Sequence, residues 1–277
     1  MHAPPNLLET AAARKLPPPL HSTLSLPYIY ICIYMTHISP FPLQKGKKRN
    51  KLKMSFQRFY EGWLEQLRHL MIQLNQSPRP PLTDEDHQQL QSLVQKTMSH
   101  YTEYYRVKSL VAKTDVLVIF AAPWSTTMER SLHWIAGWRP TTAFHLIYTE
   151  ASIRFESQII DILRGLRNGD LGDLSPAQFR RVSELQCETV REENAITDEL
   201  SQWQDGASDF QDMREDVEEK MQVLGRVAEK ADDLRLQTIV KLVELLTPRQ
   251  AAEFLIAAAH LQIGVRGWGV DFDLHHS

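Results

Sequence analysis

The stretch PWSTTMERSLHWIAGWRP, residues 123–140, holds three tryptophans, two arginines, one glutamate and one histidine, with a proline at each end. Thr126 is followed three residues later by Glu129, which has the form of a capping box and predicts that a helix begins inside the stretch. Gly137 suits the C-cap of that helix, and Pro140 cannot continue it. The stretch therefore predicts a helix-and-turn unit.

Two interpretations of this unit stay open. On the expected helix Trp134 and Trp138 lie four residues apart and are neighbours, with Arg130 one turn before Trp134 on the same side. The aromatic residues then either anchor the helix in the core, with the arginine paired internally, or form the rim of a groove. The second interpretation rests on the high share of binding energy that Trp and Arg carry at protein interfaces.

Outward from this stretch the apolar residues keep a helical period in both directions, and no strand pattern or fixed repeat is present. Proline, glycine and capping residues mark the breaks between the helices. The helices are predicted at residues 55–76, 83–122, 126–137, 142–167, 175–204, 212–246 and 248–264. The three glycines after Leu261 are expected to end the last of them. The predicted fold class is all-α, a single multi-helix bundle of about seven helices.

The first fifty-three residues differ from the rest of the chain. Their apolar run LPYIYICIYM (26–35) is too short to span a bilayer, which needs roughly 20 residues, and its flanks do not match a signal peptide. We expect residues 1–53 to be a disordered basic extension, or upstream sequence before a natural start at Met54. The helical domain is assigned to 54–270 and a disordered tail to 271–277. The basic run at 45–53 is a candidate nuclear localisation patch.

Charge is divided unequally along the chain. Residues 1–53 hold eight Lys or Arg and one acid, a charge of +7, so the remaining residues carry −3 − 7 = −10. An acidic body repels the phosphates of nucleic acid. Direct DNA binding by the helical body is therefore not expected.

No pattern in the sequence points to catalysis. A glycine-rich phosphate loop and a nucleophile elbow are both missing, and the histidines are isolated or lie in the terminal pair at 275–276. Cys32 and Cys187 lie far apart in unlike contexts, which indicates a reducing compartment. We predict that the protein is not an enzyme and uses no cofactor or metal ion.

The stretch that opened this section resembles the signature of the plant Delay of Germination (DOG) domain, which is shared with the C-terminal half of TGA-type bZIP transcription factors. The matching residues are Trp124, Thr126, Glu129, Arg130, Trp134, Gly137, Arg139 and Pro140. Thr127 stands where proline is usual. Further blocks at 59–67, 100–116 and 231–257 are similar to family segments in the same order.

The resemblance implies a regulator of the zipper-less dormancy branch, because residues 1–53 supply no basic region with heptads. Such a protein takes part in transcription regulation, seed dormancy and abscisic acid signalling through type 2C protein phosphatases or transcriptional co-regulators. Nuclear and also cytoplasmic localisation is implied, and a homodimer is compatible with this role. The candidate partner-binding residues are the matching residues of the motif given above, Thr126 excepted.

Some dormancy-branch members carry a His-x-x-x-His pair near the C-terminus that is linked to haem binding. Here Gln262 and Arg266 align with those two positions, and neither is a usual haem ligand. We therefore predict that this chain does not bind haem in that way. An alternative function is that of a small-molecule sensor, in which aromatic helices enclose an apolar ligand such as an acyl chain.

Overall fold

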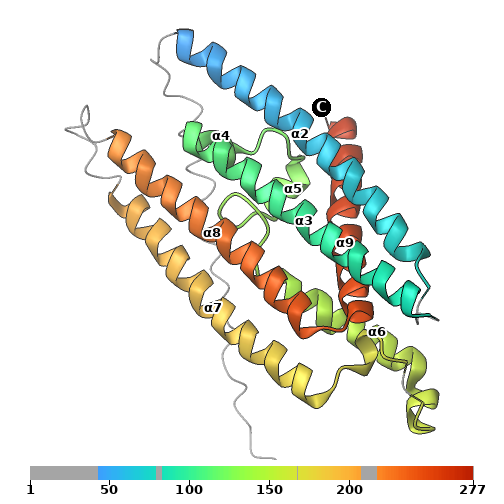
Figure 1. Cartoon of the computed structure of the whole chain (residues 1–277). Helices are drawn as coiled ribbons and strands as arrows, with labels where there is room; N and C mark the ends of the chain where they lie inside the picture. The colour runs from blue at the N-terminus through green and yellow to red at the C-terminus, as the bar shows by residue number, and fades with distance from the viewer. Residues whose placement is uncertain (1–42, 79–82, 167, 207–216, 277) are drawn as a thin grey trace, which may run out of the picture. The chain divides into compact units, whose positions relative to one another are not determined.

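The computed structural model describes residues 43–78, 83–166, 168–206 and 217–276. Within these ranges the segments with a helical spacing of apolar residues form helices. Every regular element within those ranges is a helix, which confirms the predicted all-α fold class. The elements, labelled in Figure 1 where there is room, are α2 (Leu43–Gln76), α3 (Asp84–Thr114), α4 (Val116–Ala121), α5 (Thr127–Ser131), α6 (Thr142–Leu163), the 3₁₀ helix η1 (Leu171–Asp173), α7 (Pro176–Asp205), α8 (Val217–Leu245) and α9 (Pro248–His276).

Two helix starts follow directly from local side-chain chemistry. Thr83 accepts a hydrogen bond from the backbone N–H of Asp86, whose carboxylate accepts one from the backbone N–H of Thr83. Ser175 and Gln178 form the same reciprocal pair at the start of α7. These pairs satisfy amides that a helix leaves unpaired, and they confirm both predicted starts. The start of another helix, predicted at residue 212, lies outside the described residues.

The N-terminal boundary of the first helix was predicted wrongly. α2 begins at Leu43 and not at Met54, so the residues before Met54 that the structure describes are helical. Arg49 forms an ion pair with Asp115 at 2.8 Å, which ties this part of α2 to the end of α3. The contact lies between residues far apart in the sequence and had no local signal. The rest of the extension, residues 1–42, lies outside the described residues.

The predicted C-terminal boundary was also wrong. α9 runs through all three glycines to His276, so the tail expected to be disordered at 271–277 is helical as far as it is described. Arg266 is ion-paired with a buried carboxylate of α5, and Asp273 accepts a hydrogen bond of 3.1 Å from the backbone N–H of Thr127. These contacts offset the cost of about 1 kcal/mol that each glycine adds to a helix.

The long second helix of the prediction is two helices. Asp115 has an extended backbone, and its carboxylate accepts a hydrogen bond from the backbone N–H of Leu117, which caps α4. A capping carboxylate stabilises a new helix start, so one apolar run gives two helices. α6 likewise ends at Leu163, before the predicted limit at 167, and Gly165 then takes a left-handed φ of 78° that suits a helix terminus.

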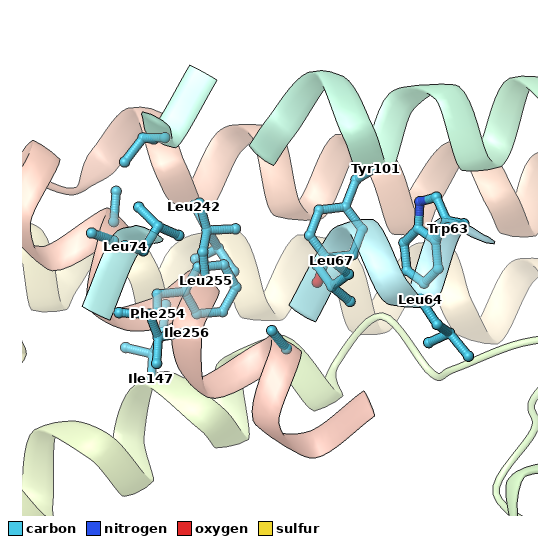
Figure 2. Close-up of a cluster of buried hydrophobic side chains, with 14 of the residues drawn as sticks. Trp63, Leu64, Leu67, Leu74, Tyr101, Ile147, Leu242, Phe254, Leu255 and Ile256 are labelled. Carbon is cyan, nitrogen blue, oxygen red and sulfur yellow. The ribbon is translucent and has the colours of Figure 1, made fainter. Parts of the chain in front are cut away.

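The buried side chains form two clusters. The larger is built mainly from α2, α3, α6 and α9, and Figure 2 shows Leu74, Ile147 and Phe254 from three of these helices gathered in it. The smaller is built mainly from α7 and α8, with α4 beside them. Ala136 belongs to the larger cluster and its neighbour Ile135 to the smaller, so the stretch between α5 and α6 joins the two.

Candidate functional site

Only the first part of the helix predicted at 126–137 is helical. The capping box of Thr126 and Glu129 forms as expected, but α5 ends at Ser131, and residues 132–141 leave the helix. We call residues 132–141 the motif loop. Trp134 and Trp138 both lie in it, so the expectation that they are neighbours on one helix face was wrong.

The motif loop leaves the helix because its carbonyl groups bond to side chains from distant helices. The buried guanidinium of Arg235 donates to the carbonyl oxygens of Trp134, Ile135 and Trp138. Lys108 Nζ donates to the carbonyl of Ala136 at 2.7 Å. These side chains replace the backbone N–H groups that a continuing helix would supply.

The two cations share one carboxylate. Asp232 Oδ1 lies 2.8 Å from Lys108 Nζ and 2.5 Å from Arg235 Nη1. We call these three residues the Asp232 cluster. Beside it Ile135 and Ala136 have left-handed φ angles of 45° and 60°, which cost of order 1–3 kcal/mol each for residues with a side chain. The carbonyl bonds from the cluster hold the backbone in that conformation.

A second cluster lies at the start of α5 around Glu129, which is only 1% exposed. Its carboxylate accepts hydrogen bonds from the Tyr60 hydroxyl at 2.7 Å and from Arg266 Nη1 at 2.9 Å. Burial, and then the nearby Glu129 carboxylate, raise the pKa of Tyr60 well above its usual value, so the phenol stays a donor. Gln262 in turn donates to the Tyr60 hydroxyl at 2.9 Å. Both residues that stand at the haem-linked positions are thus engaged in this Glu129 cluster, and the absence of haem binding stays a prediction.

A third cluster connects the end of the motif loop to α7. The buried Glu193 carboxylate accepts hydrogen bonds from Arg139 Nε at 3.0 Å and from the backbone N–H of Thr141 at 2.7 Å. One turn along α7, the hydroxyl of Thr197 accepts a hydrogen bond from the Trp134 indole N–H at 3.0 Å. Three buried carboxylates on three helices therefore hold the two ends and the middle of the motif.

The structure divides the candidate residues into two groups. Trp124, Glu129 and Pro140 are buried, and Trp134 is half-buried. A side chain added at Gly137 would meet Arg235 Cζ at 3.0 Å, so this glycine allows the close approach of the guanidinium. The buried group matches the interpretation as core anchors. Only Arg130 and Arg139 are exposed, with Leu132 between them.

Sequence reasoning missed the residues that hold the motif. Lys108, Asp232, Arg235 and Glu193 are all buried, and none was a candidate. The first three lie inside blocks that resemble family segments, which is a signal of importance. No pattern indicated that they would meet the motif loop, because the contacts of Lys108, Glu193 and Arg235 with it span 28 to 101 residues of sequence.

Two kinds of feature are not found among the described residues. Across those ranges no three His, Cys, Asp or Glu side chains come together in a way that could hold a metal ion. Among the helices whose residues are described, none combines the length and the apolar character that crossing a membrane requires.

Comparisons with known proteins agree on one family. The family model described as "DOG1: Seed dormancy control" matches residues 64–149, which include the motif and its loop. The chain is 31% identical to Protein DOG1-like 2 of Arabidopsis thaliana over 199 residues, covering 65% of this chain and 77% of that protein. It is 29% identical to Protein DOG1-like 4 of the same species, covering 81% and 96%. It is also 27% identical to Transcription factor TGA5 of that species, covering 77% and 63%.

Proposed function

Because the chain belongs to the DOG1 seed dormancy control family, we propose that it is a regulatory protein that works by binding other proteins and carries out no catalysis. Its role is in transcription regulation, seed dormancy and abscisic acid signalling, in the nucleus and also in the cytoplasm. The partners are type 2C protein phosphatases or transcriptional co-regulators. Support comes from relatives named as DOG1-like proteins and as transcription factors.

The observation that carries this proposal is that some residues of the motif are buried and others are exposed. Its buried residues fix the backbone of the motif loop through the three clusters, while Arg130, Leu132 and Arg139 stand at the surface. Leu132 is 47% exposed, and the Arg139 side chain is 49% exposed. We call these three residues the outer face. A surface held rigid before binding loses little conformational freedom when a partner docks, so more of its contact energy remains as affinity.

The negative charge of the residues after position 53 favours contact with DNA through a partner protein over direct binding. The residues after the basic extension carry −10, which opposes approach to a phosphate backbone. We expect the protein to act at promoters when a DNA-binding transcription factor carries it there. In a mobility-shift assay at physiological salt, the full chain alone should leave a DNA duplex unshifted.

The outer face can be tested by exchanging two of its side chains in the full chain. We expect the double variant Arg130→Ala with Leu132→Ser to bind a type 2C phosphatase or a co-regulator at least tenfold more weakly, which corresponds to about 1.4 kcal/mol. Surface plasmon resonance measures the affinity. A matched control is Arg106→Ala with Leu110→Ser, which changes the same two residue types at exposed positions of α3.

The result is interpretable only if the variants fold. Circular dichroism should show the same helical signal for both double variants as for the unchanged chain. If the outer-face variant keeps that signal and still binds the partner with unchanged affinity, the outer face is not the contact surface.

A further inference from the structure

A cavity of about 110 Å³ lies beside the motif loop. Several aromatic side chains line it, among them Trp63 from α2, Tyr101, Tyr104 and Tyr105 from α3, and Trp138 from the loop. An apolar cavity of about 150 Å³ takes up benzene. This cavity is smaller but open at one side, so it holds at most one small ring or a short branched chain and is too small for a long acyl chain. The lining also includes the half-exposed Arg139, so the cavity reaches the surface there.

The charged groups in the lining are all cations. They are Lys108, Arg139 and Arg235, and no carboxylate is among the lining residues in the described ranges. Asp232 and Glu193 form ion pairs with these cations but do not line the cavity. The three cations and two carboxylates together carry +3 − 2 = +1. Burial lowers the pKa of Lys108 to about 8, which leaves it protonated at neutral pH. An anion is therefore favoured inside the cavity.

The same walls hold donors that the protein does not use. Tyr101 is only 8% exposed, and within the described residues its hydroxyl has no hydrogen-bond partner; those of Tyr104 and Tyr105 have none either. Burial raises the pKa of all three phenols, so they remain donors. Lys108 Nζ has three hydrogens and donates two of them to the protein. Because these hydroxyls belong to residues that line the cavity, they are available to donate to an oxygen atom of a ligand.

We propose that this cavity is a binding site for a small monocarboxylic acid with one ring or a short branched chain. The carboxylate accepts hydrogen bonds from Lys108 and from the tyrosine hydroxyls, and the apolar body contacts the aromatic walls. A cation is repelled by the net positive charge, and a neutral alcohol loses the charge interaction. Arg139 belongs both to the outer face and to the cavity lining, but the outer-face variant changes only Arg130 and Leu132, which do not line the cavity, so this inference is tested apart from partner binding.

The test uses the full chain and three probes of nearly equal size: benzoate, benzyl alcohol and benzylamine. Isothermal titration calorimetry should show benzoate binding at least tenfold more tightly than benzyl alcohol, with no binding of benzylamine. Decanoate, which is too long for the cavity, should bind no better than benzyl alcohol.

Variants then locate the site. Tyr101→Phe and Tyr105→Phe each remove one hydroxyl and keep the ring, and each should weaken benzoate binding at least threefold without changing the binding of benzyl alcohol. The matched control is Tyr148→Phe, because the Tyr148 hydroxyl bonds Gln186 on α7 and lies outside the cavity lining. It should leave benzoate binding unchanged.

Three results would overturn the proposal. They are no saturable benzoate binding by the unchanged chain, equal binding of the anionic, neutral and cationic probes, and no effect of either tyrosine variant. Partner affinity is measured separately with the outer-face variant, so a failure of the proposed function is distinguished from a failure of this site.

Discussion

Arg235 shows how one side chain fixes the conformation of a motif that it does not belong to. It makes hydrogen bonds to three carbonyls of the motif loop and to Asp232, and its guanidinium lies 5.3 Å from the centre of the Trp134 ring. The sequence identified Trp134 because aromatic residues stand out. It did not identify Arg235, because an arginine on a helix is ordinarily a solvated side chain.

Replacing Arg235 with alanine should destabilise the fold strongly. The change leaves three carbonyls without donors and Asp232 with one cation, and breaking a buried ion pair typically costs about 3–5 kcal/mol. Urea unfolding followed by circular dichroism measures the loss. Arg106→Ala, which breaks an exposed pair on α3, should leave the unfolding midpoint unchanged. Equal midpoints for the two variants would contradict the role given to Arg235.

His133 gives the stability a pH dependence. Burial, and then the charges of Lys108 and Arg235, lower its pKa to about 3, against 6.5 in an unfolded chain. The unfolded state binds more protons between these values, so the contribution of His133 is complete above pH 6.5 and is lost as the pH falls towards 3.

Between pH 7 and pH 5 this histidine should therefore cost the unchanged chain about 2 kcal/mol of its unfolding free energy. The His133→Gln variant should lose less stability over the same interval by that amount. Urea titrations at both pH values give the two differences. Parallel losses in the two proteins would show that His133 does not titrate in this way.

At the scale of elements, the helix starts at Thr83 and Ser175 were predictable, whereas the start of α2 and the end of α9 were not. The starts at Thr83 and Ser175 depend on capping residues within one turn, and the sequence shows them directly. The last helix ends at His276 because tertiary contacts carry it past its glycines. Glycine weakens a helix locally, but packing against α5 decides the outcome, and no window of local sequence contains that information.

The glycines of α9 should respond differently to alanine. A Cβ at Gly269 would overlap Thr126 Oγ1, whereas a Cβ at Gly267 would meet nothing within 4 Å. Gly267→Ala should therefore raise the unfolding free energy by about 0.5–1 kcal/mol through helix propensity. Gly269→Ala should lower it by about 1–3 kcal/mol, because the new methyl group displaces the residue that caps α5. Thermal unfolding compares them, and stabilisation by both variants would exclude the close approach.

At the scale of the whole described domain, α7 packs chiefly against α8. Its polar links to the motif loop come from Glu193 and Thr197, and further hydrogen bonds join it to Tyr148 of α6 and to Gln250 of α9. The all-α class was predictable because apolar periodicity is a property of each segment. Which helices meet depends on long-range pairings, and residues such as Glu193 gave no local sign of them.

Glu193→Gln should loosen α7 selectively. The amide keeps the shape of the side chain but leaves Arg139 without its counter-charge, so amides in α7 and in the motif loop should exchange hydrogen at least tenfold faster. Amides in α2 and α9 should be unaffected. Hydrogen exchange with mass spectrometry measures both regions. The exposed neighbour Glu192→Gln is the control, and a uniform change over all helices would argue against a separate role for this link.

The distance along the chain between the motif loop and Arg235 also has a consequence during protein synthesis. Arg235 is translated 97 residues after Trp138. At about 5–20 residues per second a ribosome needs about 5–20 s to cover that distance. Throughout this interval the newly made turn at Ile135 and Ala136 lacks the hydrogen bonds that the Arg235 guanidinium will donate. The motif loop can therefore take its final conformation only after α8 has emerged from the ribosome.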